Sequence, residues 1–379
     1  MSRHLLPLSA SALLLCGTAL AEAPSVAVDI APVHSLVARV MDGVGTPDLI
    51  IQPGASPHSY NLRPSEAAAL ENADLVFWVG EDLTPWLENA IDTLSANASV
   101  TALLDAEGTT LLDFRENALF EAHDHDEHGH DDHDHDEHGH DDHGDEEHAK
   151  ADDHDDHDEH GHDDHDHDEH GHDEHGHDDH GDEEHAKADD HDDHDEHGHD
   201  EHGHDDHGHG DHDPHAWLSP DNAAAWLNVI AAQLSAADPD NAGTYFANAS
   251  AAREDLDDLK TELSGLLEPA RGKNFIVFHD AYQYFESDFD FPAAGAISLG
   301  DATDPSPARV AEIQQRVQSE GIDCVLAEPQ FNPSLVQTVL DGTDANTGVL
   351  DPLGSDLTPG QDLYPQLLRN LAQALADCL

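Results

Sequence analysis

Short apolar runs alternate along the chain with longer stretches of helical spacing. Four β-rich runs lie in the first third, at residues 26–31, 48–51, 75–79 and 100–103. Four more lie in the last third, at residues 275–278, 293–298, 324–327 and 348–350. Buried strands separated by helical stretches are typical of α/β folds. The pattern therefore predicts two β/α units, the second repeating the first.

One long helical pattern separates the two units. Its apolar stripe consists of Leu256, Leu259, Leu263, Leu266 and Leu267, spaced as on one face of a helix. We predict an N-terminal lobe over residues 22–238, a linking helix over 239–268 and a C-terminal lobe over 269–379. The expected fold class is α/β, with two β/α lobes joined by one long rigid helix.

The first lobe contains an insertion of unusual composition, residues 121–213, called the His-rich tract below. From residue 123 to 212 it holds no aliphatic or aromatic side chain larger than alanine, and residues 135–163 recur identically at 172–200. A segment without apolar side chains cannot build a core or a stacked repeat. We predict that the tract is disordered.

The net charge of the chain is −71, and the His-rich tract accounts for −42 of it. The remainder still carries −29. This excess of negative charge argues against binding to nucleic acid or to anionic membranes. It fits the hypothesis of adaptation to saline surroundings, where salt screens repulsion between surface charges.

Residues 1–21 have the pattern of a cleavable signal peptide. Arg3 and His4 precede an apolar run that is too short for a membrane span, and Ala19-Leu20-Ala21 offers small residues for cleavage. Lipoprotein cleavage before Cys16 is the alternative, which Leu15 disfavours because a small residue is expected there. We expect the mature chain outside the cytoplasm.

Removal of the signal peptide takes Cys16 and leaves Cys324 and Cys378. An even pair of cysteines in an oxidising compartment favours a disulfide. The alternative, a metal site with two thiolates, normally requires closer spacing in the sequence.

Of the 36 histidines, 31 lie in the His-rich tract and His4 lies in the signal peptide. Three of the remaining four, His58, His215 and His279, occupy loops at the ends of predicted elements. Neutral imidazole is a common zinc ligand, and three histidines with a fourth ligand form a tetrahedral shell. His34 lies at the start of a predicted helix and has no comparable loop motif around it, so we expect a structural role for it.

Six short motifs around these residues resemble, in order, the metal-binding subunits of bacterial ABC importers, and most closely their zinc branch. The motifs are residues 54–58, 62–65, 214–220, 278–282, 327–331 and 351–354. The resemblance implies that Zn²⁺, the transported ligand, is held between the lobes by His58, His215 and His279. It also implies a periplasmic monomer that delivers zinc to the inner-membrane ABC permease.

Further details follow from the same resemblance. The manganese branch usually carries glutamate in place of His279, in keeping with the preference of zinc for imidazole. Some zinc-branch members have glutamate where this chain has Pro57, so the fourth ligand stays open between Asp351 and water. Cys324 and Cys378 match a disulfide of the family.

Two other functions deserve comparison with zinc delivery. Three histidines and a water also form a catalytic zinc site, but the sequence contains no HExxH pair and no positioned general base. A periplasmic metal store would rely on the His-rich tract, whose histidines and carboxylates can form many weak sites. We predict a binding protein that is not an enzyme, with the tract as weaker capture sites.

Overall fold

The computed structural model describes residues 23–115, 120, 212–298 and 305–379. The predicted signal peptide and nearly all of the His-rich tract lie outside these residues. The described residues belong to one compact unit that includes both lobes. Among them, no helix has both the length and the apolar character needed to cross a bilayer.

The first lobe is a four-stranded parallel sheet with the strand order β2-β1-β3-β4. Its strands are β1 (Val26–Val28), β2 (Asp48–Leu49), β3 (Leu75–Trp78) and β4 (Ser99–Ala102). Its helices are α1 (Ala31–Val40), α2 (Pro64–Glu71) and α3 (Pro85–Leu94). Each strand overlaps one of the apolar runs, so this part of the fold prediction is confirmed.

The second lobe repeats the same topology in the order β6-β5-β7-β8, again with parallel strands. Its strands are β5 (Phe275–His279), β6 (Gly295–Ser298), β7 (Cys324–Ala327) and β8 (Asn346–Val349). Its helices are α6 (Gln283–Phe289), α7 (Pro307–Glu320), α8 (Pro333–Leu340) and α9 (Leu363–Cys378). The prediction of two similar β/α units is therefore confirmed.

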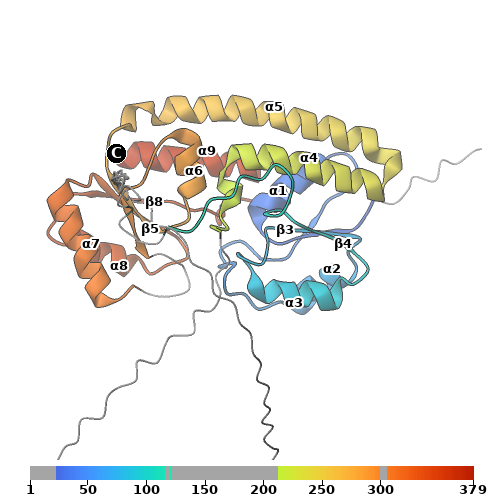
Figure 1. The fold of residues 1–379 in the computed structure, drawn as a ribbon, viewed down its shortest axis with the longest axis horizontal. Helices are drawn as coiled ribbons and strands as arrows, with labels where there is room; N and C mark the ends of the chain where they lie inside the picture. Colours follow the sequence, from blue (N-terminus) through green and yellow to red (C-terminus); the bar gives the residue numbers. More distant parts are fainter. Residues whose placement is uncertain (1–22, 116–119, 121–211, 299–304) are drawn as a thin grey trace, which may run out of the picture. The chain divides into compact units, whose positions relative to one another are not determined.

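The connection between the lobes is helical. It consists of η1 (Ala216–Leu218), α4 (Pro220–Ala237), η2 (Pro239–Asn241), α5 (Ala242–Leu267) and η3 (Glu268–Ala270). Helix α5 runs along both lobes (Figure 1) and buries Leu256, Leu259, Leu263 and Leu267. Leu266, also part of the predicted stripe, is only partly buried. The predicted linking helix is thus present.

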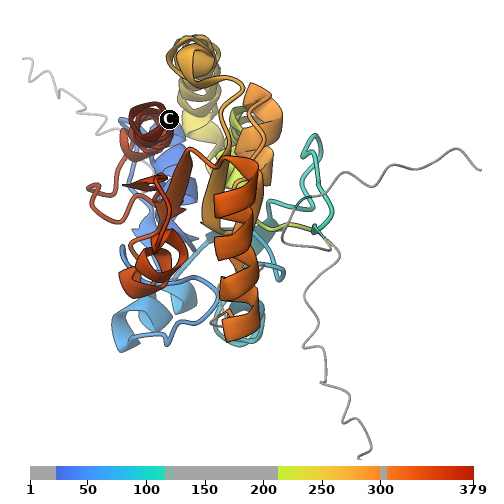
Figure 2. The same ribbon diagram turned by 90° about the vertical axis from the view of Figure 1, so that its left-hand side faces the viewer.

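Alternate residues of β5 face two different apolar clusters. Phe275 and Val277 belong to the large core that continues through α5 and α9 into the first lobe. Ile276 and Phe278 belong to a smaller cluster under α7 and α8. Figure 2 looks along α5 and shows the second lobe beneath it. Helices thus cover both faces of this sheet, as parallel sheets require.

The predicted disulfide is present between Cys324 and Cys378, with the two Cα atoms 5.8 Å apart. It ties the start of β7 to the end of α9, and both cysteines are buried. The last helix is thereby fixed to the second lobe.

Candidate metal centre

His58 lies in the loop between β2 and α2. Gly54 begins this loop with φ of 84°, a left-handed conformation that glycine adopts without strain. The His58 amide donates a 3.3 Å hydrogen bond to Ser56 Oγ, and Trp86 of α3 donates its indole N–H to the Pro57 carbonyl at 2.8 Å. The first contact lies within the loop, and the second holds the loop against α3 of the first lobe, with His58 half-buried.

His215 lies just after the His-rich tract, directly before η1. Asp213 Oδ1 accepts hydrogen bonds from the His215 amide at 2.9 Å and from its Nδ1 at 2.7 Å. The ring lies 5.3 Å from that of Trp217, whose indole N–H donates to the Pro352 carbonyl at 2.8 Å. His215 is therefore buried and oriented by a carboxylate.

His279 ends β5, where the carboxyl ends of neighbouring parallel strands meet. Glu328 directly follows β7, which pairs with β5. Its Oε1 accepts from the His279 amide at 3.2 Å and from Nδ1 at 2.7 Å. The second buried imidazole is thus oriented in the same way as the first.

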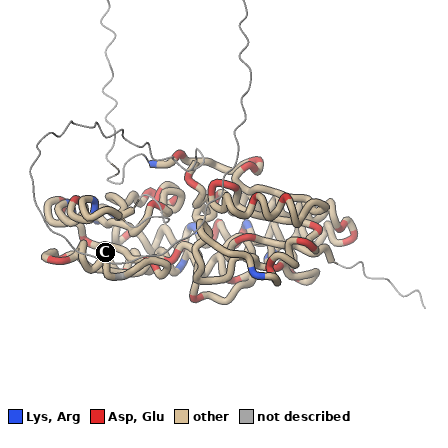
Figure 3. The backbone as a smooth tube through the Cα atoms, turned by 90° about the horizontal axis from the view of Figure 1, so that it is seen from below, with Lys and Arg blue, Asp and Glu red and all other residues tan. Residues whose placement is uncertain are grey.

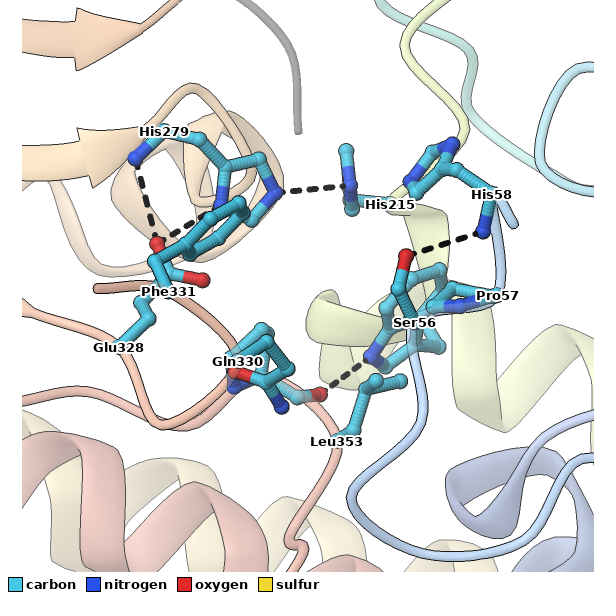
Figure 4. Close-up of a pocket in the computed structure, with 11 residues that line it drawn as sticks. Ser56, Pro57, His58, His215, His279, Glu328, Gln330, Phe331 and Leu353 are labelled. Atoms are coloured by element: carbon cyan, nitrogen blue, oxygen red, sulfur yellow. Dashed lines mark hydrogen bonds and ion pairs between the residues drawn. The ribbon is translucent and has the colours of Figure 1, made fainter. Parts of the chain in front are cut away.

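The three predicted histidines line one pocket of about 280 Å³. Figure 4 shows His215 between the other two, with ring centroids 5.2 Å from His279 and 5.7 Å from His58. Among the described residues, the pocket is lined by Ser56, Pro57, His58, His215, Trp217, His279, Glu328, Gln330, Phe331, Pro352 and Leu353. The structure thus brings the three histidines to one pocket, and their role as zinc ligands stays a prediction.

The Nε2 atoms of His215 and His279 lie 3.4 Å apart. A carboxylate at each Nδ1 favours the proton on that nitrogen, which leaves an Nε2 lone pair directed toward the other ring. Two ligands of a tetrahedral zinc ion, at the usual Zn–N distance, are about 3.3 Å apart. The spacing of this pair therefore fits a shared zinc ion.

His58 is not yet part of a complete ligand set. In the ranges that the structure covers, no three His, Cys, Asp or Glu side chains are gathered as a preformed metal shell. The His58 ring is tilted by 48° to that of His215.

Asp351 occupies a turn after β8. Its Oδ1 accepts from the amides of Leu353 at 3.1 Å and Gly354 at 3.0 Å, and its Oδ2 accepts from the Ser355 amide. Gln330 Nε2 adds a 3.3 Å contact to Oδ1. Asp351 is not among the described residues that line the pocket. Its role as fourth ligand stays a prediction, beside water.

His34 lies apart from this site. Its Nε2 is 3.1 Å from the Pro47 carbonyl oxygen, and the residue is buried in α1. Burial lowers the pKa of His34, which keeps the ring neutral within the first lobe. This placement is consistent with the structural role expected from the sequence.

Sequence reasoning did not single out the two carboxylates that orient the imidazoles. Asp213 was counted within the tract, and Glu328 appeared only within a resemblance motif. Burial raises the pKa of Asp213 to about 7, while the His215 amide and the charge of Arg115 oppose the rise. A signal was present, because a carboxylate two residues before a candidate ligand can reach its Nδ1.

Two α/β lobes that share a long helix and place histidines in a pocket between them define a metal-binding solute-binding protein. The model of one family, described as zinc-uptake complex component A, periplasmic, matches residues 26–378. The chain belongs to this family, whose members are transport components and not enzymes.

Relatives and solved structures agree with this assignment. The chain is 44% identical to the high-affinity zinc uptake system protein ZnuA of Brucella abortus, covering 96% of this chain and 94% of that protein. It is 43% identical to ZnuA of Paracoccus denitrificans, covering 95% and 93%. A crystal structure of ZnuA superimposes with a TM-score of 0.62 at 19% identity, covering 94% of this chain and 99% of that chain. This last likeness supports the fold alone.

Proposed function

We propose that the chain binds one Zn²⁺ through His58, His215 and His279 and delivers it to the permease of an ABC importer. The observation that carries this proposal is the 3.4 Å separation of the His215 and His279 Nε2 atoms, each backed by a carboxylate. Such carboxylate–histidine pairs orient zinc ligands in many proteins. The names of the relatives, which are zinc uptake proteins, support the choice of metal.

Two neutral imidazoles with facing lone pairs repel each other unless a cation lies between them. Zn²⁺ removes this repulsion and gains two bonds at once, so the pair favours metal capture. His58 then supplies a third nitrogen from the first lobe, and water or Asp351 completes the shell. Delivery requires that the ion leave again, and the half-buried His58 is the ligand through which the shell can open.

The remaining parts of the proposal concern the rest of the chain. Residues 1–21 direct export to the periplasm and are removed, and the mature protein acts as a monomer. The His-rich tract captures zinc weakly through its histidines and carboxylates. Because it is tethered to the same chain, it raises the concentration of metal near the site.

The test is zinc binding by a protein that lacks residues 123–211, called the tract-deleted protein. We expect one tight zinc ion per chain, and a loss of affinity by orders of magnitude when His58, His215 and His279 are all changed to alanine. Arg253→Gln on the exposed face of α5 serves as the control. A triple variant with the tight site intact would contradict the proposal, whereas turnover of a substrate would favour the zinc hydrolase.

A further inference from the structure

Arg115 lies where the described chain approaches the start of the His-rich tract. Its Nε donates to Gln283 Oε1 at 2.8 Å. Its Nη2 lies 3.0 Å from Glu286 Oε2 and 3.4 Å from Asp280 Oδ1, and its guanidinium carbon is 3.8 Å from the centre of the Phe120 ring. The side chain is only 18% exposed. Arg115 therefore joins the beginning of the tract to α6 and the loop before it.

The two ends of the tract are also joined to each other. Asp113 and His212 form an antiparallel bridge, with His212 Nδ1 3.0 Å from Asp113 Oδ1. The Asp213 amide donates to the Leu112 carbonyl at 2.8 Å. The segments at residues 112–115 and 212–213 thus form one base, from which the tract leaves and to which it returns.

The first turn of α6 holds both strands of this base. Gln283 Nε2 donates to the Asp113 carbonyl at 3.1 Å. The Tyr284 hydroxyl accepts from the Leu112 amide at 3.0 Å and donates to the Asp213 carbonyl at 2.7 Å. The same base is therefore fixed to the second lobe by both neutral hydrogen bonds and the charge of Arg115.

This anchor adjoins two of the proposed zinc ligands. Asp213 orients His215, and Asp280 directly follows His279 in the chain. Asp280 is buried, and its Oδ1 lies 3.4 Å from Arg115 Nη2. Glu286 is buried on the same guanidinium, with Oε2 3.0 Å from Nη2. The positive charge of Arg115 offsets part of the energetic cost of burying these carboxylates.

We propose that Arg115 is a positioning residue of the metal site. It fixes the base of the His-rich tract relative to the segments that carry His215 and His279. The Nε2 atoms of these two histidines thereby keep the spacing that zinc requires. This inference rests on the proposed function. It goes beyond it because the described contacts of Arg115 are with Gln283, Glu286, Asp280 and Phe120, and none of these is a proposed ligand.

The physical reason lies in the geometry of guanidinium. Its planar set of donors can reach Gln283, Glu286 and Asp280 together, which a single ammonium group cannot do in the same way. Without it, the contacts that tie residues 112–115 to Gln283, Glu286 and Asp280 are lost. The segments before His215 and after His279 then shift independently, and the shared metal is released more easily.

The experiment compares Arg115→Gln, Arg115→Lys and Arg253→Gln in the full chain loaded with one equivalent of Zn²⁺ or Co²⁺. Zinc release to a chelator reports the dissociation rate, and the visible spectrum of Co²⁺ reports the geometry of the site. We expect about tenfold faster release and an altered spectrum for Arg115→Gln, by analogy with other outer-shell changes. Arg115→Lys should fall between this variant and the wild type, and Arg253→Gln should match the wild type.

A folded Arg115→Gln protein with wild-type release and a wild-type cobalt spectrum would overturn the inference. Thermal melting of the metal-free proteins shows whether each variant folds. If Arg115→Gln does not fold, the comparison uses Arg115→Lys. Zinc release from a folded Arg115→Lys protein at the wild-type rate would then overturn the inference. Failure of the wild type and Arg253→Gln to bind zinc tightly would instead overturn the proposed function, so the two failures are distinguishable.

Discussion

Glu328 holds His279 through a single carboxylate oxygen, which accepts from both the amide and Nδ1 of the histidine. The two residues are 49 positions apart in the sequence, and adjacent parallel strands bring them together. The negative charge of Glu328 increases the basicity of the imidazole and fixes its tautomer. The residue after the neighbouring strand thus fixes the orientation of this imidazole.

Replacing Glu328 by glutamine tests this relationship. The amide keeps the size of the side chain but removes its charge, so we expect the affinity of the tight zinc site to fall about 10- to 100-fold. The measurement is competition with a zinc chelator in the tract-deleted protein. Glu254→Gln, on the exposed side of α5, is the matched control. Equal affinities for the two variants would show that the charge of Glu328 is irrelevant.

The disulfide should stabilise the fold without contributing to metal binding. It closes a loop of 54 residues, for which the chain-entropy model gives about 4 kcal/mol of stabilisation. We therefore expect the Cys324→Ser/Cys378→Ser variant to melt at a lower temperature and still to bind one zinc ion when folded. Calorimetry measures the first effect and zinc titration the second. Titration of two free thiols in the native oxidised protein would refute the bond.

Deletion of the His-rich tract should separate the two kinds of zinc binding. The tract-deleted protein keeps His212, and with it the bridge to Asp113. We expect its single tight site to remain and the additional weak binding of the full chain to disappear. That weak binding should also fade as the pH falls toward about 5, since protons compete for imidazole. Isothermal titration of both proteins at neutral and acidic pH distinguishes these sites, and loss of the tight site on deletion would assign a ligand to the tract.

Salt should stabilise the folded lobes. Acidic residues are spread over both lobes in Figure 3, with few basic ones between them. Outside the His-rich tract the chain still carries −29, so repulsion opposes the compact state and is screened by ions. We expect the melting temperature of the tract-deleted protein to rise between 0.05 and about 1 M NaCl. A melting temperature that falls over this range would exclude net repulsion as a determinant of stability.

The sequence was sufficient to predict the fold because the apolar runs are short and are separated by stretches with helical spacing. Each of the eight runs overlaps a strand, and the leucine stripe lies on α5. Most strand ends differ from the predicted runs by a few residues, and two departures from the pattern show a physical reason. The strand expected from residue 293 begins at Gly295, because Ala293 donates its amide to the Glu286 carboxylate instead of to a strand. Leu266 lies at the edge of the apolar face of α5 and is only partly buried.

Only the histidines of the candidate site could be predicted from the sequence, because their residue type alone suggests metal binding. His58, His215 and His279 were the histidines left in loops once the tract and signal peptide were set aside. The partner of His279 was not predictable in this way, because Glu328 reaches it through the pairing of β7 with β5. Arg115 reaches α6 through tertiary contacts, and nothing in the local sequence marks it. Asp351 was proposed from its match to a ligand position of the resembled family. In the structure it accepts hydrogen bonds from its own turn, and its role as a ligand stays a prediction.

The bridge between Asp113 and His212 has a consequence for the evolution of this chain. Because Asp113 pairs with His212, the segments on either side of the insertion are held together whatever its length. Copies of a coding repeat can be gained or lost by recombination there without moving any strand or ligand. The identical stretches at residues 135–163 and 172–200 are the trace that such an event would leave. Under the proposed function, such an event changes the number of capture sites and leaves the two lobes as they are.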